Sequence, residues 1–131
     1  MRVPVKPLLA TALYVVVLLP LLVTDNDGRP HPRTYLLEFR HGSAGRIAGD
    51  AILNVAVFVP LGWLLGRALR DLPVPRPAQL AGVAAVCAAL SLGVETLQFF
   101  LPTRYSSLID VLANTGGAVL GAGAPHVRSR P

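Results

Sequence analysis

The sequence predicts an all-α polytopic membrane protein, a bundle of about four transmembrane helices in a single domain over residues 1–131. Two observations favour this class. Hydrophobic residues make up 53% of the chain and its mean hydropathy is +0.55, values above those of a typical soluble domain. These residues are also gathered into four runs, whose lengths approach the ~20 residues that cross a bilayer as a helix.

The first two runs predict helices over residues 5–24 and 51–69. The first run contains no charged residue at its centre, and the second is interrupted by Asn54 and Arg67. A cleaved signal peptide is an alternative for the first run, but no cleavage site with small residues follows it. We therefore expect two membrane spans from this half of the chain.

The last two runs predict helices over residues 78–101 and 108–124. The third has full spanning length, whereas the fourth is shorter and rich in glycine. Gly117 and Gly121 form a GxxxG motif, which lets another helix approach closely in lipid. Such a pair also arises by chance in a glycine-rich helix, so close packing and the absence of any special role are both open.

Short connections, several of them containing proline, predict helices that run up and down in turn. The exception is an extracytoplasmic loop predicted over residues 25–49, where residues 34–40 could form an amphipathic turn at the membrane surface. Seven positive residues fall on the side of the termini and five on the other side. This bias predicts a multi-pass protein of the cell membrane with both termini in the cytoplasm.

The net charge of +5 does not indicate nucleic-acid binding, because the basic residues stand singly between apolar runs and form no stripe or tail. The single cysteine, Cys87, lies in an apolar run, which argues against a thiolate metal site. Three histidines fall in the loop and the tail, far apart in sequence: His31, His41 and His126. We expect no metal site and no other cofactor.

Polar residues are predicted to meet at one depth, near the membrane face opposite the termini. Short turns place the end of one helix beside the start of the next, and the spacing within each polar pair puts both members on one helix face. The pairs are Asp50 and Asn54, Glu95 and Gln98, and Asp110 and Asn114. Arg104, between the third and fourth helices, is the nearest cation and could pair with Glu95 or Asp110.

These seven residues are candidates for ligand binding. A carboxylate near hydrocarbon costs a few kcal/mol, so it is seldom retained without a partner or a function. Glu95 is the clearest example, because it lies about four turns into an apolar helix. The alternative is that Glu95 and the amides only join helices through hydrogen bonds. Asp50 could equally be an exposed residue that the dipole favours at a helix start.

The same two residue types also recur along the chain. Asp50-x3-Asn54 and Asp110-x3-Asn114 stand sixty residues apart, each on the second helix of a pair. This spacing indicates two similar two-helix hairpins, related by an axis along the membrane normal.

A longer string of polar and small residues carries a family resemblance. It reads Glu95-x2-Gln98-x3-Pro102-x-Arg104-x5-Asp110-x3-Asn114-x2-Gly117-x3-Gly121, and it is preceded by Asn54-x3-Phe58-x-Pro60-Leu61-Gly62. In residues and spacing it resembles the VanZ-like membrane proteins, named after an accessory protein of teicoplanin resistance. The resemblance implies an integral membrane protein, linked in the founding member to lower teicoplanin susceptibility, with no established reaction.

Two functions follow as hypotheses. The first is a non-enzymatic protein that binds a lipid-linked cell-wall precursor or a lipoglycopeptide, with Arg104 on a phosphate or carboxylate and the amides on a sugar or peptide. The alternative is a membrane enzyme for a lipid-linked substrate, with Glu95 or Asp110 as general acid or base. Ser107 is a candidate nucleophile for that enzyme, and a turn or cap role is its alternative.

Overall fold

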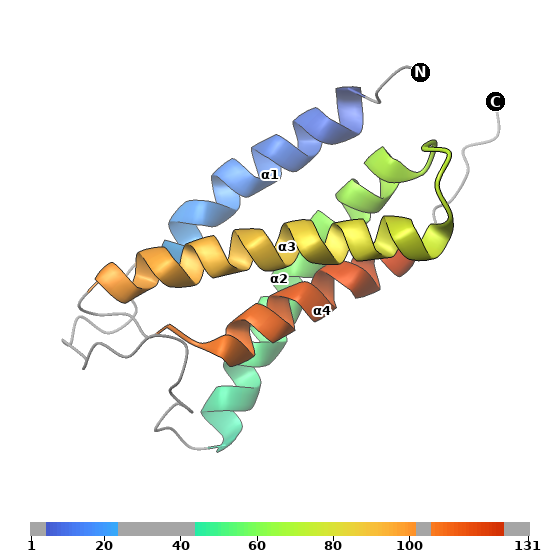
Figure 1. Cartoon of the computed structure of the whole chain (residues 1–131). Coiled ribbons are helices and arrows are strands. Elements are labelled where there is room, and N and C mark those ends of the chain that lie inside the picture. Colours follow the sequence, from blue (N-terminus) through green and yellow to red (C-terminus); the bar gives the residue numbers. More distant parts are fainter. Residues whose placement is uncertain (1–4, 24–43, 102–105, 125–131) are drawn as a thin grey trace.

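The computed structural model describes residues 5–23, 44–101 and 106–124, and it confirms the helical class (Figure 1). Within these ranges the chain forms four α-helices and no strand. The helices are α1 (Val5–Val23), α2 (Ala44–Leu69), α3 (Arg76–Phe100) and α4 (Leu108–Gly123). Two of them, α2 and α3, are long and apolar enough to cross a membrane. The apolar parts of α1 and α4 are shorter.

Three helices begin and end close to the predicted positions, but α2 begins seven residues earlier, at Ala44. The last six residues of the expected loop over 25–49, residues 44–49, therefore belong to the helix. Hydropathy marks only the part of a helix that is apolar, whereas the backbone hydrogen bonds of a helix continue into polar residues. The predicted amphipathic turn at residues 34–40 lies outside the described residues.

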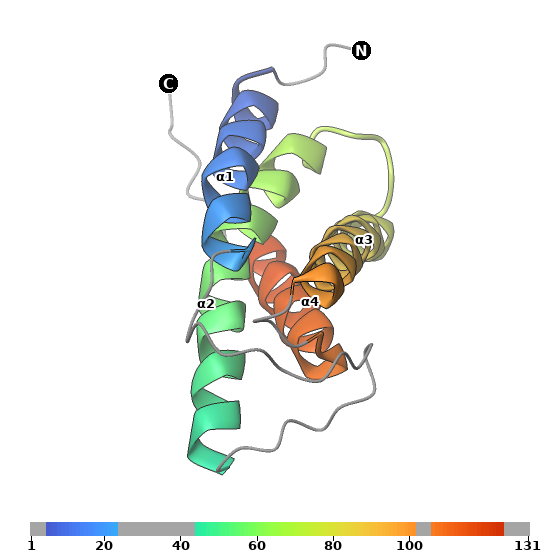
Figure 2. The same ribbon diagram turned by 90° about the vertical axis from the view of Figure 1, so that its left-hand side faces the viewer.

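The helices alternate in direction, so their ends gather in two groups (Figure 1). We call the first group the terminal end, which holds the start of α1, the end of α2, the start of α3 and the end of α4. The opposite group is the loop end, which holds the end of α1, the start of α2, the end of α3 and the start of α4. Figure 2 shows α2 and α4 crossing, with α1 and α3 beside them.

The closest helix packing joins α2 and α4 through glycine. A Cβ atom built on Gly117 would overlap the carbonyl of Val55 and lie 2.9 Å from its Cα. One turn further along both helices, a Cβ atom on Gly121 would overlap the carbonyl of Val59. Backbone therefore packs against backbone, as in GxxxG contacts between membrane helices. Of the two interpretations of this motif, close packing is confirmed.

Glycines of α2 complete the same interface from the other side. Gly62 belongs to the string that carries the family resemblance, whereas the sequence did not single out Gly66. A Cβ atom on Gly62 would overlap the carbonyl of Ala118, and one on Gly66 would lie 3.0 Å from the Cα of Ala122. Residue numbers rise together along the two helices, so α2 and α4 are parallel. Their partners stand about sixty positions apart, and the relation of the two hairpins by an axis stays a prediction.

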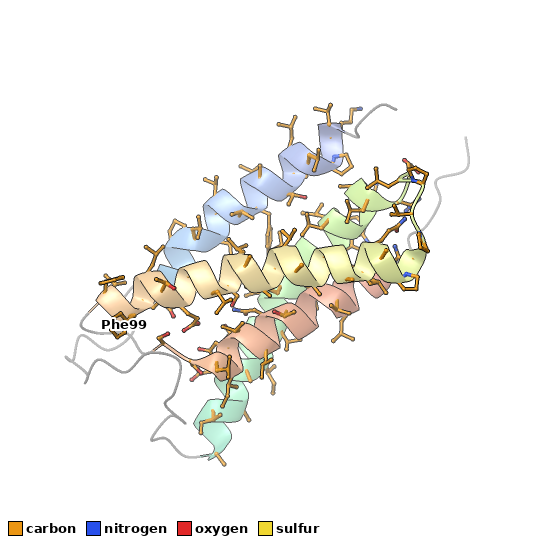
Figure 3. All side chains as sticks on the ribbon, viewed as in Figure 1. Phe99 is labelled. Atoms are coloured by element: carbon orange, nitrogen blue, oxygen red, sulfur yellow. The ribbon has the colours of Figure 1, made fainter. Side chains whose placement is uncertain are left out.

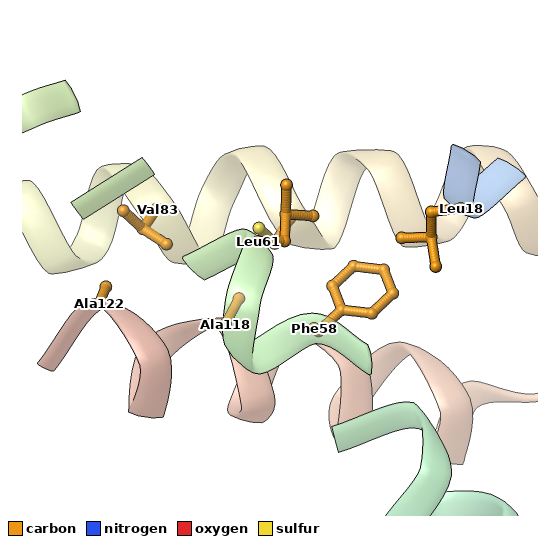
Figure 4. Close-up of a cluster of buried hydrophobic side chains, with 7 residues drawn as sticks. Leu18, Phe58, Leu61, Val83, Ala118 and Ala122 are labelled. Carbon is orange, nitrogen blue, oxygen red and sulfur yellow. The ribbon is translucent and has the colours of Figure 1, made fainter. Parts of the chain in front are cut away.

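The apolar core lies where the four helices meet. It contains Leu18, Phe58, Leu61, Val83, Cys87, Ala118 and Ala122. The side chains of Phe58 and Leu61 extend from α2 into the space between α3 and α4 (Figure 4). Small residues on α4 leave room for these large side chains on α2, which is why alanines and glycines dominate the α4 face.

The outside of the bundle is apolar, and its inside holds polar groups. Large hydrophobic side chains project from all four helices (Figure 3). They include Leu9, Leu13, Val16, Ile52, Leu53, Val86, Phe100, Leu112 and Leu120. The buried polar residues are Gln79, Ser91, Glu95, Gln98, Ser106, Ser107 and Asn114. Soluble proteins distribute these groups in the opposite way, so the arrangement fits a protein surrounded by lipid.

The described contacts that hold α1 to the other helices include Leu18 in the core and a hydrogen bond from Tyr14. The hydroxyl of Tyr14 donates to the backbone carbonyl of Val57 at 2.6 Å. Pro60 cannot donate to the carbonyl of Ala56, the residue before Val57, so the hydrogen-bond ladder of α2 is interrupted beside this contact.

Replacement of Tyr14 by phenylalanine removes this hydrogen bond and keeps the ring. We expect the free energy of unfolding to fall by about 0.5–1.5 kcal/mol, measured by unfolding in detergent. Thr11→Val is a suitable control, because the Thr11 hydroxyl bonds only to Pro7 of its own helix among the contacts described. Equal stability of the wild type and Tyr14→Phe would show that the hydrogen bond contributes nothing.

Candidate functional site

The buried face of α3 changes from apolar to polar toward the loop end. Its buried positions recur about every four residues, from Val83 and Cys87 in the core to Ser91, Glu95 and Gln98. Three further polar residues are buried near the start of α4 and along it: Ser106, Ser107 and Asn114. We call the six polar residues, Ser91, Glu95, Gln98, Ser106, Ser107 and Asn114, the loop-end cluster.

Glu95 connects the end of α3 to the start of α4. Its side chain is 2% exposed, and its Oε2 atom accepts a hydrogen bond from the backbone N–H of Ser107 at 2.6 Å. Ser107 is the N-cap residue of α4, and its own hydroxyl makes no capping hydrogen bond among the described residues. In a capping box a Glu of the same helix bonds to this N–H. Here the carboxyl group comes from α3, and its oxygen lies at the positive end of the α4 dipole.

Asn114 makes a second link between the same two helices. Its Nδ2 atom donates a hydrogen bond to the Ser91 hydroxyl oxygen at 2.8 Å, one turn of α3 away from Glu95. Both side chains are fully or almost fully buried. A side-chain hydrogen bond between helices inside an apolar bundle fixes their register, because the unpaired groups would be costly there.

Two polar atoms of the cluster have no hydrogen-bond partner within the described part of the chain. They are the Oδ1 atom of Asn114 and the hydroxyl oxygen of Ser106, and both residues are about as buried as Glu95. A buried polar group without a partner costs about 1–3 kcal/mol. In a folded protein such a group calls for an explanation, for example a bound ligand or an ordered water molecule.

The remaining predicted site residues divide into two groups. Asp50 and Asn54 of α2 and Asp110 of α4 are half-buried, and all three lie in the parts of their helices that lead to the loop end. Asn54 precedes Val55, which packs against α4, so the amide lies at the level of the α4 contact. Arg104 lies outside the described residues, and its pairing with Glu95 or Asp110 stays a prediction.

The sequence did not single out Ser91 or Ser106, although both belong to the cluster. A signal for Ser91 was present, because it lies four residues before Glu95 and therefore on the same helix face. Serine hardly changes the hydropathy of a run, so it does not stand out in the sequence of an apolar helix. Ser107 was considered as a nucleophile or a cap. The structure makes it the N-cap residue, and its backbone N–H binds Glu95.

The chemistry of the cluster is that of hydrogen bonding. It combines one carboxylate, two amides and three hydroxyl groups, and within the described residues no group of three His, Cys, Asp or Glu side chains could hold a metal ion. The three histidines lie outside the described residues. Groups of this kind recognise hydroxyl, amide or phosphate groups of a ligand.

The comparison with family models supplies the identification. The model described as VanZ/LLP1 matches residues 8–128, which is most of the chain. The chain belongs to the VanZ/LLP1 family. Comparisons with curated proteins and with solved structures found no match.

Membership of the VanZ/LLP1 family confirms the resemblance drawn from the polar and glycine string. The matched region contains all four helices except the first residues of α1, and it contains the whole loop-end cluster. The apolar exterior and the VanZ/LLP1 family together fit a membrane protein.

Proposed function

We propose that this VanZ/LLP1 protein is a non-enzymatic membrane protein that binds a polar, lipid-linked ligand of the cell envelope at its loop end. The observation that carries the proposal is the loop-end cluster, in which a carboxylate and two polar atoms without a described partner are buried in an apolar bundle. Burial of such groups is costly unless another group completes their hydrogen bonds. A bound headgroup would complete them.

Access to the cluster is supported by the exposure of its neighbours. Asp50, Asn54 and Asp110 are only half-buried, so they form the outer part of the proposed site, and the loop-end cluster forms its inner part. A ligand with an acyl or polyprenyl tail would keep the tail against the apolar exterior while its headgroup meets these residues. We place the loop end outside the cytoplasm and both termini inside, as the distribution of positive charge favours.

The ligand class follows from this location. A lipid-linked cell-wall precursor and a lipoglycopeptide such as teicoplanin both present sugars, amides and acidic groups beside an apolar tail. The amides and hydroxyl groups of the cluster suit the sugar or peptide, and Arg104 suits a phosphate or carboxylate. The link to teicoplanin rests on the family resemblance and is part of the proposal.

The test compares the wild type with Glu95→Gln and Arg104→Ala. We expect both variants to remain in the membrane and to lose any change in teicoplanin susceptibility that the wild type confers on a host cell. Binding of a lipid-linked precursor by the purified protein should fall at least tenfold in both, because each variant removes one ionisable group from the site. Thr115→Val is the control, since the Thr115 hydroxyl bonds to Val111 in its own helix.

Two results would contradict the proposal. If both variants bind the precursor as the wild type does and confer the same susceptibility, the residues assigned to the site are wrong. Conversion of the precursor into a product by the purified wild type would favour the alternative of a membrane enzyme, with Glu95 or Asp110 as general acid or base. The carboxyl group of Glu95 accepts a hydrogen bond from the backbone N–H of Ser107, an arrangement that favours binding and positioning.

A further inference from the structure

Charge is segregated along the bundle. Of the five Lys and Arg residues within the described ranges, four lie at the terminal end, in the first or last turns of three different helices or directly after them: Lys6, Arg67, Arg70 and Arg76. Of the four described acids, Asp71 alone lies at that end. The other three belong to the loop end. Among the described residues, basic side chains therefore predominate at the terminal end and acidic side chains at the loop end.

Arg76 has a structural role that separates it from the other three cations. Its guanidinium donates hydrogen bonds to the backbone carbonyl of Ala122, in the last turn of α4, and to the side chain of Gln79 at 3.2 Å. The last carbonyls of a helix have no partner within the helix, and a cation there also complements the dipole. Arg76 thus caps α4.

Lys6, Arg67 and Arg70 are placed differently. Lys6 and Arg67 are exposed, and Arg70 is half-buried. The guanidinium carbon of Arg67 lies 4.9 Å from the ring centre of Trp63, one turn earlier in α2. Tryptophan typically marks the level of the lipid headgroups, and a long basic side chain at the end of an apolar helix extends to the same level. Basic side chains in these positions are expected to reach the level of the lipid headgroups.

We propose that Lys6, Arg67 and Arg70 form a binding face for the phosphate groups of anionic phospholipids, independent of the site at the loop end. Phosphate-bearing headgroups are the anions present at this depth. Each basic residue near an anionic surface adds a favourable electrostatic interaction. The contact with the Trp63 ring holds the guanidinium of Arg67 in place, and a guanidinium suits a phosphate because it offers paired hydrogen-bond donors. This face would make the stability of the bundle depend on lipid charge.

The test measures thermal unfolding of the full chain in nanodiscs of phosphatidylglycerol and of phosphatidylcholine. We expect the wild type to unfold ~3 °C or more higher in phosphatidylglycerol, and about half a molar salt to reduce that difference because it screens surface charge. The triple variant K6Q/R67Q/R70Q should lose most of the difference between the lipids. Arg76→Gln should lower the midpoint in both lipids and keep the difference, since its contact is with α4.

Several outcomes would overturn the inference. Equal wild-type midpoints in the two lipids would do so without any variant, as would a difference that salt does not reduce. An unchanged difference in the triple variant would assign the lipid effect to other residues. If the triple variant fails to fold, R67K/R70K retains the charges and should keep the full difference; its loss would contradict a charge-based contact.

Discussion

Replacement of Gly117 by alanine will lower the free energy of unfolding by about 3 kcal/mol, one of the largest effects expected from a single methyl group in this chain. The added Cβ atom would occupy the position of the Val55 carbonyl, and a backbone atom cannot rotate away as a side chain can. The two helices would have to separate, and an overpacked interface of this kind costs about 1–3 kcal/mol or more. The measurement is reversible unfolding of the purified protein in detergent.

The neighbouring glycine provides the control for this experiment. A Cβ atom on Gly116 meets nothing within 4 Å, and the residue is exposed on the same helix. Gly116→Ala should therefore leave stability unchanged or raise it by up to ~1 kcal/mol through helix propensity. Equal effects at the two positions would mean that α2 and α4 do not pack as closely as the structure places them.

Replacement of Glu95 by alanine is expected to have the second large effect on the free energy of unfolding. The change removes the acceptor for the Ser107 N–H and leaves a buried donor at the start of α4 without its partner. Hydrogen bonds to charged groups contribute about 1.5–3 kcal/mol, and the truncation also leaves a cavity. We expect a loss of ~3 kcal/mol in the free energy of unfolding.

Glutamine at position 95 separates the fold from the function. Glu95→Gln keeps an oxygen that can accept the Ser107 N–H, so most of the stability should be retained while the proposed ligand binding is lost. Hydrogen exchange at the first turn of α4 offers a local readout, and it should accelerate in the alanine variant and not in the glutamine variant. Slow exchange there in Glu95→Ala would contradict the capping role.

Much of the candidate site could be predicted because polar residues stand out in apolar helices. Glu95, Gln98 and Asn114 break hydrophobic runs, and the structure buries all three at the loop end. Their mutual contacts were not predictable in the same way. The partner of Asn114 is Ser91, which scarcely alters hydropathy, and the partner of Glu95 is a backbone N–H, which every residue except proline carries.

In the fold, too, the helices could be predicted from the sequence, but the contacts between them could not. Four apolar runs give four helices within a few residues, apart from the early start of α2 at Ala44. The motif at Gly117 and Gly121 predicts close packing, but small residues occur along every helix, so it does not specify which helix approaches. The packing role of Gly62 and Gly66 is visible only once α2 lies beside α4.

The glycine contact also limits how this molecule can move. Where main chain touches main chain, no side chain is available to change rotamer and absorb a displacement, so α2 and α4 must travel as one rigid body. α1 meets the other helices through side chains, among them the hydroxyl of Tyr14. Any opening that admits a bulky molecule would therefore swing α1 against a fixed frame, and crosslinks between α2 and α4 should leave that motion intact.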